Sequence, residues 1–274
     1  MVRWRLWCWP AAAPSGDDVD VTTFGNVVDE YDAGRPSYPP DVVDALGPIA
    51  GLAVLDVGAG TGRATELLVE RDASVVAIDV EPEMLRRAVD RMSSLAAVVA
   101  DGARLPIRRE SVDVACFAQS WHWLDPAGRT AEVARVLVPG GRWAAWWSHA
   151  RADGERWFDD YWTVVEHACP GTHRGQRDTD WGVTVAATDL FAAAERVDVP
   201  WVRTVSIDEW MLDQASHTYI AVLPQPRREH VLGALRRILE GRFPGGDVEV
   251  RYATWLWTAV RHGRASARQP LVQA

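Results

Sequence analysis

The chain of 274 residues contains 48% hydrophobic and 24% charged residues, which is ordinary for a globular protein with a buried core. Its formal net charge of −9 excludes the clustered basic surface that duplex nucleic acid needs, so we expect no nucleic-acid partner. The apolar runs are too short to span a bilayer and the three cysteines lack disulfide or metal-ligand spacing, which predicts a cytoplasmic protein without a membrane partner or a metal site.

The start of the chain predicts little regular structure. Residues 1–23 form a loose extension in this interpretation, because Pro10 interrupts a stretch that is too short for the apolar core of a signal peptide. Residues 39–47 predict a short helix, which begins at two prolines and ends at a Gly-Pro pair.

Short apolar runs then alternate with helical stretches. The runs predict strands at Ala53–Val57, Ser74–Asp79, Ala96–Ala100, Val112–Ala118 and Arg142–Ser148. The stretches predict helices at about Gly62–Arg71, Pro82–Met92 and Pro126–Leu137, the last with an Asp-Pro start and a Pro-Gly-Gly stop. Continuous Val, Ala and Ile strands separated by helices indicate a parallel sheet covered on both faces. The sequence therefore predicts an α/β, doubly wound, Rossmann-like core over residues 24–150.

The pattern changes after this core. Residues 151–195 are polar, rich in tryptophan and weakly periodic, and they predict a helical lid. Residues 196–262 should complete the sheet with a strand at about Arg196–Ser206, a helix at Pro226–Glu240 stopped by Gly241, and a half-buried last strand near Val248–Thr258. We expect this last strand to be antiparallel and residues 263–274 to form a tail.

Three carboxylates follow the predicted strands at nearly equal spacing. Asp56, Asp79 and Asp101 are 23 and 22 residues apart, about the length of one βα unit. Ligands of open α/β sheets bind outside the carboxyl ends of the strands. We therefore expect the three acids to line one edge of the sheet, and this edge is the candidate site.

The turn after the first strand disfavours a dinucleotide. Its glycines follow the pattern Gly58-x-Gly60-x-Gly62, which places Arg63 where the third glycine of the dinucleotide fingerprint belongs. Asp56 stands just before this turn, where a carboxylate would repel a pyrophosphate. A ligand with a ribose, an adenine and a positively charged tail suits the turn better.

Four stretches in order complete the pattern: Val54–Gly62 (VLDVGAGTG), Val75–Leu85 (VVAIDVEPEML), Ala100–Pro106 (ADGARLP) and Ala134–Arg142 (ARVLVPGGR). Together they resemble the motifs of class I S-adenosylmethionine-dependent methyltransferases, in particular a type 11-like subgroup that acts on small molecules. The likeness is good over residues 24–150 and loose beyond them. It implies S-adenosyl-L-methionine as the cofactor and S-adenosyl-L-homocysteine as the product.

The resemblance also implies roles for single residues. It implies that the glycines hold the methionine portion of the cofactor, with Asp56 favouring its ammonium group, and that Asp79 accepts hydrogen bonds from the ribose hydroxyls. Asp101 would bind the adenine amino group beside the Gly102 amide, and Met84 would pack on the adenine. The alternatives are that the acids cap helices or face solvent and that Met84 is a core residue.

Further candidates surround the methionine end. Tyr31 and Arg35 belong to a Tyr-x-x-x-Arg-Pro-x-Tyr-Pro motif of this subgroup and would fold over that end, although they could also pack a helix against the sheet. Gln119 would help to place the methionine tail. His122 is the best-placed catalytic base, and its alternative is a structural histidine between two tryptophans.

These features predict methyl transfer to a small-molecule acceptor by in-line displacement. Trp157, Trp162, Trp181 and Trp210, which we group as the tryptophans of the lid, suggest a partly apolar acceptor, or they fill core space. One rival is an NAD(P)-dependent oxidoreductase on a similar sheet, which needs the dinucleotide fingerprint that is missing here. The other rival is a noncatalytic protein that binds S-adenosylmethionine.

Overall fold

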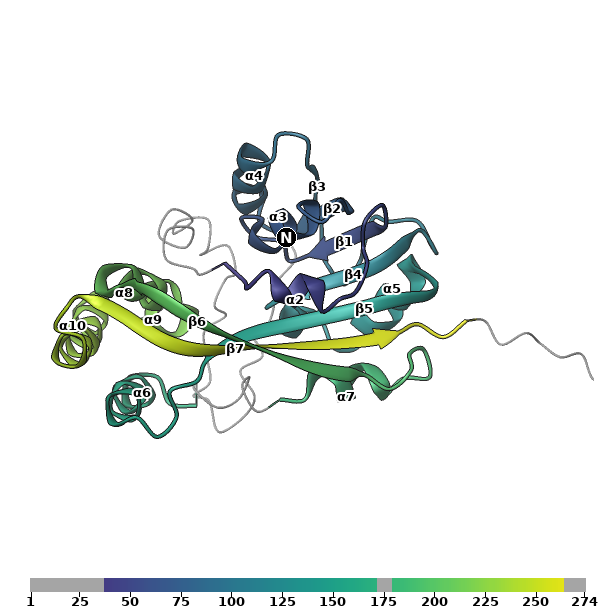
Figure 1. Ribbon diagram of the computed structural model, residues 1–274. Helices are drawn as coiled ribbons and strands as arrows, with labels where there is room; N and C mark the ends of the chain where they lie inside the picture. The colour runs from purple at the N-terminus through teal and green to yellow at the C-terminus, as the bar shows by residue number, and fades with distance from the viewer. Residues whose placement is uncertain (1–36, 172–178, 264–274) are drawn as a thin grey trace, which may run out of the picture.

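The computed structural model describes residues 37–171 and 179–263. Within these ranges a seven-stranded sheet runs through the molecule, with helices on both faces and a further group of helices at one end (Figure 1). The predicted extension, the tail beyond residue 263, and the candidates Tyr31 and Arg35 lie outside the described residues.

The strands lie in the order β3-β2-β1-β4-β5-β7-β6. Their bounds are β1 Ala53–Val57, β2 Ser74–Asp79, β3 Ala96–Val99, β4 Val112–Ala118, β5 Leu137–Ala150, β6 Glu195–Ser206 and β7 Asp247–Val260. Strands β1 to β5 are parallel, and β7 pairs antiparallel with both β5 and β6. This confirms the predicted Rossmann-like α/β fold with an antiparallel last strand.

Alternate residues of the central strands face opposite layers of helices. Val114 and Cys116 of β4 pack towards one face, whereas Ala115 and Phe117 pack towards the other. Helices α2 (Asp41–Asp44), α3 (Arg63–Val69) and α4 (Pro82–Arg91) cover the first face, and α5 (Arg129–Val136) and α7 (Trp181–Ala186) cover the second. The strands are apolar on both sides because both sides are covered.

Two boundaries around α5 differ from the prediction. The helix was expected from Pro126, but the Asp125 carboxylate accepts the amide of Ala127 (3.0 Å), and the resulting turn delays the helix to Arg129. Strand β5 begins at Leu137 because it already pairs there with β4, before a register irregularity. The Pro-Gly-Gly sequence is therefore a bulge inside the strand and not a stop before it.

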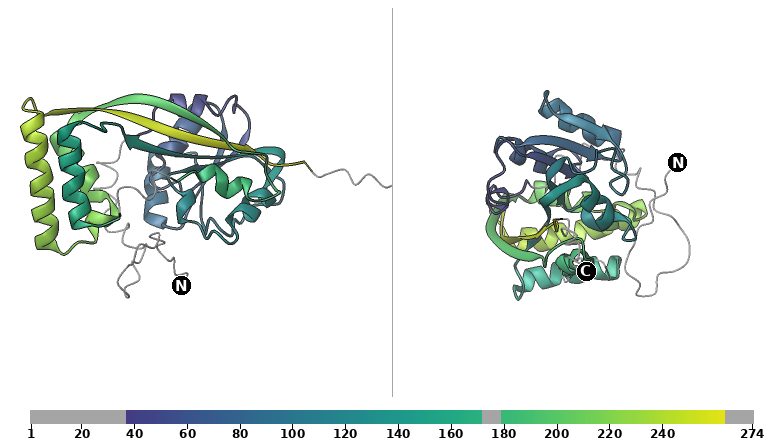
Figure 2. Two further views of the ribbon diagram at one scale, coloured as in Figure 1. Left: turned by 90° about the horizontal axis from the view of Figure 1, so that it is seen from below. Right: turned by 90° about the vertical axis from the view of Figure 1, so that its right-hand side faces the viewer.

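The last two strands extend past the parallel part of the sheet. β7 pairs with β5 as far as Tyr252, opposite Ala150, and the residues of β7 before Tyr252 pair with β6 alone. The extension carries a helical unit that packs around its own core and consists of α6 (Arg156–Ala168), α8 (Ile207–Ser216), α9 (Thr218–Ala221) and α10 (Gln225–Arg242). This unit stands beyond the carboxyl ends of the parallel strands (Figures 1 and 2).

The segment predicted as a lid supplies helices in two places. α6 joins the helical unit, whereas α7 packs on the sheet beside β7. Gly241 lies within the last turn of α10, so the prediction that it ends this helix is wrong. Among the helices of residues 37–171 and 179–263, none is both long and apolar enough to cross a membrane.

Candidate active site

The glycine turn leaves β1 at the carboxyl edge of the sheet. The amides of Gly58 and Ala59 donate to the carbonyl of Ile78 at the end of β2, at 2.8 and 3.0 Å. Gly58, Gly60 and Gly62 have φ of +72°, +57° and +85°, which side chains rarely adopt. The turn therefore depends on glycine at all three positions.

The three glycines face different surroundings. A Cβ on Gly58 would collide with the Cβ of Ser120, and one on Gly62 would lie 2.8 Å from the Cβ of Ala88 on α4. A Cβ on Gly60 would meet nothing within 4 Å among the described residues. Gly58 and Gly62 are thus needed for close packing, whereas Gly60 leaves open space at the turn for a ligand.

Asp56 is buried within β1 and keeps spare hydrogen-bonding capacity. The Oγ1 of Thr65 on α3 donates to its Oδ2 at 2.6 Å. Its Oδ1 is buried and has no hydrogen-bond partner among the described residues. Burial is the main cause that raises the pKa of Asp56 to about 6; the Thr65 hydrogen bond opposes this shift, and the neighbouring Asp79 contributes to it. A cationic ligand group at this oxygen would relieve the cost of burying the charge.

Asp79 ends β2 and ties the glycine turn to it. The amide of Gly60 donates to its Oδ2 at 2.8 Å, and the amide of Glu81 donates to its Oδ1 at 2.9 Å. Burial raises the pKa of Asp79, and these backbone amides oppose that shift. Each carboxylate oxygen can accept a second hydrogen bond, so Asp79 can hold the turn and also bind hydroxyl groups.

Asp101 follows β3 in a tight turn. Its Oδ1 accepts the amide of Ala103 at 2.7 Å, and its carbonyl accepts the amide of Arg104 at 2.9 Å. Gly102 is a packing position, because a Cβ there would lie 2.8 Å from Val57. The three predicted acids therefore all lie at or just below the carboxyl edge, as expected from their spacing. Met84 is 5% exposed and lies on the buried face of α4.

The loop after β4 brings the remaining candidates to the same edge. Gln119 has φ of +53°, unusual for a residue with a side chain, and its amide donates to the carbonyl of Trp146 (2.9 Å). The hydroxyl of Ser120 donates to the carbonyl of Val57, next to the glycine turn. A positive φ at a residue with a side chain, as at Gln119, often occurs at functional sites, where the surrounding structure holds it in place.

His122 lies in the short 3-10 helix Trp121–Trp123, among aromatic rings. The Nε1 of Trp147 donates to its Nδ1 at 3.3 Å. The rings of Trp123 and Trp181 lie 4.7 and 6.0 Å from the imidazole. With Nδ1 accepting this bond, the neutral ring carries its proton on Nε2 and is a hydrogen-bond donor there.

Arg129, the first residue of α5, holds this 3-10 helix in place through hydrogen bonds. Its Nη1 donates to the carbonyls of Trp121 (2.8 Å) and Leu124 (3.4 Å), and its guanidinium lies 4.6 Å from the centre of the Trp121 ring. Burial lowers the pKa of Arg129 to about 10, which still leaves it charged at neutral pH. Arg129 therefore sets the position of the residues on either side of His122.

The sequence did not single out three residues that shape the site: Thr65, Ser120 and Arg129. A threonine among the apolar residues of the predicted helix after the glycine turn was an available signal for Thr65, because buried hydroxyls need partners. Nothing local marked Ser120 or Arg129, since their partners are carbonyls supplied by other segments.

The tryptophans expected in the lid mostly fill core space. Trp157 and Trp210 are buried in the core of the helical unit. Trp181 stacks on Trp147 with ring centres 4.9 Å apart and planes inclined by 16°. Of these three tryptophans, Trp181 is the one that lies beside His122, with ring centres 6.0 Å apart.

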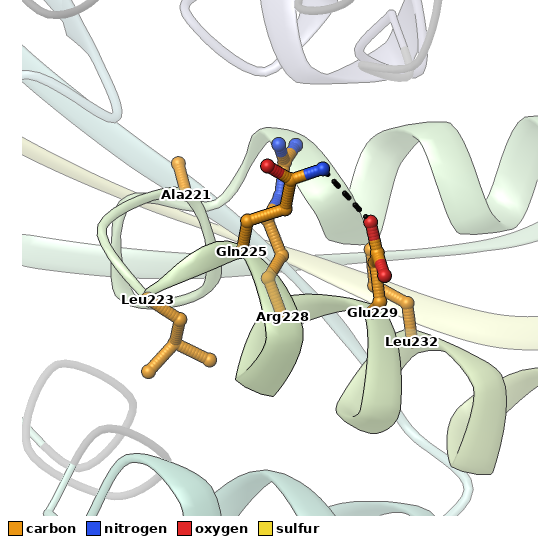
Figure 3. Close-up of a pocket in the computed structure, with 6 residues that line it drawn as sticks. All are labelled: Ala221, Leu223, Gln225, Arg228, Glu229 and Leu232. Carbon is orange, nitrogen blue, oxygen red and sulfur yellow. Dashed lines mark hydrogen bonds between the residues drawn. The ribbon is translucent and has the colours of Figure 1, made fainter.

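A separate hollow of about 430 Å³ lies where α9 meets α10 (Figure 3). On α10, at the wall of this hollow, the Nε2 of Gln225 donates to Glu229 one turn later at 3.0 Å. It is lined by Ala221, Leu223, Gln225, Arg228, Glu229 and Leu232, and none of the predicted site residues is among them.

Comparisons with known proteins identify the family of the chain. A methyltransferase-domain family matches residues 55–145, from β1 to β5. An uncharacterized methyltransferase of Mycobacterium tuberculosis is 35% identical over 217 residues, which cover 79% of this chain and 85% of the relative.

Solved structures share the fold. A protein of Anaeromyxobacter dehalogenans described as a type II methyltransferase superposes with a TM-score of 0.61 at 23% identity, over 83% of this chain and 97% of that one. Phosphoethanolamine N-methyltransferase 2 of Haemonchus contortus, solved with S-adenosyl-L-methionine, has a TM-score of 0.52 at 18% identity, over 93% of this chain and 62% of that one.

The fold and these relatives define a Rossmann-like transferase that uses an adenosyl cofactor. The chain belongs to the class I S-adenosylmethionine-dependent methyltransferases, and its methyltransferase domain is of the type 11 kind. The residues present fit this cofactor: the buried oxygen of Asp56 suits its cationic group, and the open side of Gly60 admits it close to the backbone.

Proposed function

We propose that the chain transfers a methyl group from S-adenosylmethionine to a small-molecule acceptor by in-line displacement. The cofactor supplies a methyl group on a sulfonium that is already activated toward a nucleophile. The protein then has mainly to align the acceptor and exclude water. The observation that carries the proposal is the buried Oδ1 of Asp56, which has no partner among the described residues and lies just before the open glycine turn.

The chain would hold the methionine portion of the cofactor at the glycine turn. Asp56 would attract the ammonium group, and the turn at Gly60 would let the tail pass close to the backbone. Gln119, on the neighbouring loop, would contact the same end. Tyr31 and Arg35 are proposed to cover it, on the strength of their sequence motif alone.

The adenosine portion would lie along the ends of β2 and β3. Asp79 would accept hydrogen bonds from the ribose hydroxyls with the capacity that its two backbone amides leave. Asp101 and the amide of Gly102 would bind the adenine edge, with Met84 against the ring. The sheet positions of these residues support this assignment.

The acceptor would bind between the carboxyl edge and the helical unit. We propose His122 as the catalytic residue on this side, because it lies on the loop after β4. The Trp147 hydrogen bond favours a role as donor through Nε2, which would orient an acceptor oxygen. A role as base requires that bond to break, so the two roles predict different pH profiles.

The division of the chain follows from these assignments. Residues 24–150 would form the cofactor-binding core, and residues 151–195 together with 196–262 would complete the sheet and enclose the acceptor. A cytoplasmic location is supported by Cys116, whose buried thiol forms no disulfide.

The test is methyl transfer from radiolabelled S-adenosylmethionine to a panel of small phenols, carboxylic acids and amines. We expect a labelled product whose yield is strongly reduced in Asp79→Asn. Normal S-adenosylhomocysteine binding without transfer to any acceptor class would favour the noncatalytic binding protein. Tight NAD binding without a response to the sulfonium cofactor would favour the oxidoreductase.

A further inference from the structure

The loop that carries Asp101 is held in place at its far end, near Leu105, as well as where it leaves the sheet. After the tight turn from Asp101 to Arg104, the chain reaches Leu105, which is buried in the core. Gly102 fixes the near end through its close approach to Val57. A loop at a sheet edge is mobile unless its backbone groups find partners, so the partners of the far end decide its order.

A charged pair on α5 supplies these partners. The amide of Leu105 donates to the Oε1 of Glu132 at 2.7 Å. Arg135 donates from Nη2 to the carbonyl of Leu105 at 3.0 Å and from Nη1 to the carbonyl of Ile107 at 2.9 Å. The two side chains bind each other through two further bonds of 2.8 Å. We call this arrangement the loop clamp.

The loop clamp acts mainly through the backbone groups of the Asp101 loop that it binds. The side chains of Arg135 and Glu132 are 27% and 18% exposed, and ion pairs that water still reaches contribute little stability by themselves. Charge-assisted bonds to backbone groups are stronger than neutral ones, and here they fix both polar groups of Leu105. The planar fork of arginine makes all four of these donations, and lysine cannot reproduce that geometry.

We propose that Glu132 and Arg135 are positioning residues for cofactor binding, which hold the Asp101 loop in the shape that receives the adenine. The inference rests on the proposed adenine role of Asp101. It gives a function to Arg135, which lies in the motif Ala134–Arg142 and touches none of the candidate site residues directly among its hydrogen bonds.

The same motif contains a matched control. Arg142 also donates to two backbone carbonyls, those of Leu46 and Pro48, but these belong to the connection between α2 and β1. Lysine at position 142 therefore removes a similar set of bonds away from the Asp101 loop. The difference between the two substitutions isolates the effect of the clamped loop from the general cost of losing an arginine.

The experiment measures S-adenosylhomocysteine binding by calorimetry for the full chain and for R135K, E132Q, R142K, D101N and the double variant D101N/R135K. We expect R135K to weaken binding about fivefold to tenfold, E132Q to weaken it less, and R142K to stay within about twofold of the parent. The double variant should bind about as well as D101N alone, because both changes act through one loop. Thermal melting confirms that each variant is folded.

Three results would overturn the inference. If R135K and E132Q bind as tightly as the parent while D101N is weakened, the loop clamp has no role in binding and the proposed function stands. If the effects of D101N and R135K simply multiply, Arg135 acts elsewhere. If D101N itself binds normally, the adenine assignment under the proposed function is wrong, and this inference falls with it.

Discussion

The Rossmann-like core and the region of the helical unit both bury charged side chains, but they use them in different ways. In the core, Asp56 is fully buried and keeps an oxygen that no described residue contacts by a hydrogen bond. Where β6 and β7 meet the helical unit, Arg203 of β6 donates to Asp213 of α8 at 2.5 Å and to the hydroxyl of Tyr252 of β7 at 3.3 Å. The hydrogen-bond partner of Asp56 is the neutral hydroxyl of Thr65, whereas Arg203 and Asp213 neutralise each other. A buried charge whose described partner is neutral favours a ligand of opposite charge, whereas a buried ion pair indicates packing.

Further polar groups of the helical unit follow the second pattern. The hydroxyl of Tyr161 donates to Gln214 at 2.8 Å and accepts the Nε1 of Trp210 at 3.1 Å. Burial raises the pKa of Tyr161 well above its ordinary value, so this hydroxyl stays protonated. We therefore expect substitutions in the two regions to separate stability from cofactor affinity.

The largest expected effect is on stability, in the helical unit. Asp213→Asn leaves the charge of Arg203 buried beside a neutral amide, which should cost about 3–5 kcal/mol of unfolding free energy. Urea unfolding measures this loss. Asp208→Asn is the control, because Asp208 pairs with Arg236 on the surface, and it should cost less than about 1 kcal/mol. An equal loss in both variants would remove the distinction between the two regions.

Asp79→Asn should have the next largest effect, on cofactor affinity. The amide replaces one acceptor oxygen and removes the charge, and charge-assisted bonds are worth about 1.5–3 kcal/mol each. We expect S-adenosylhomocysteine to bind at least about tenfold more weakly by calorimetry. Asp113→Asn is the control, since its Oδ2 accepts the amide of Ala53, where β1 begins, at the opposite edge of the sheet. Weaker binding in Asp113→Asn would show a general loss of structure.

Burying the Asp56 carboxylate should make the unfolding free energy depend on pH, and Asp56→Asn should remove this dependence. Burial raises the pKa of Asp56 from an ordinary 3.8 to about 6, so the native state keeps a proton that the unfolded chain releases between these values. The resulting stability is present below about pH 4 and is lost as the pH rises through about 6. Relative to Asp56→Asn, the parent should lose about 2–3 kcal/mol of unfolding free energy across this window, at about 1.4 kcal/mol per pKa unit.

Urea unfolding of both proteins at several pH values between 4 and 7 measures this difference. If the difference in unfolding free energy between the two proteins does not change with pH, Asp56 titrates at its ordinary value. Its Oδ1 would then be hydrated. The same variant should bind S-adenosylhomocysteine more weakly at neutral pH, although it is the more stable protein there.

Alanine substitutions at the glycine turn give the smallest effect on stability. Gly60→Ala should cost about 1–2 kcal/mol, because only the positive φ opposes it. Gly62→Ala should cost more, because its Cβ would also press on Ala88 of α4. Cofactor affinity should change in the opposite order, with the larger loss in Gly60→Ala. Equal affinities in the two variants would mean that no ligand passes the open side of Gly60.

The sequence predicted the core well because its signals are local. The strands β1, β2 and β4 have the predicted bounds, since apolar runs between helices leave no other place for them. The equal spacing of Asp56, Asp79 and Asp101 placed them at one edge, because parallel strands end together. Their roles toward the cofactor stay predictions.

The element boundaries and the partners of several site residues depend on contacts between distant segments, which a local sequence pattern does not reveal. Helix α5 begins later than predicted because the Asp125 carboxylate accepts the amide of Ala127. Strand β5 begins earlier than predicted because it already pairs with β4 at Leu137. The tryptophans of the lid gave no sign of whether they face a ligand or a core, since packing between α6 and α8 decides this. Arg129 and Ser120 bind carbonyls of other segments, which the sequence alone does not reveal.

The central claim is that the open glycine turn, with its buried carboxylate, receives a cationic adenosyl cofactor. The most direct test is a crystal structure of the full chain with S-adenosylhomocysteine. We predict the amino group near the Oδ1 of Asp56, the tail along Gly60 and the ribose on Asp79. Electron density for the ligand at the hollow between α9 and α10 instead, with an unchanged glycine turn, would contradict the account.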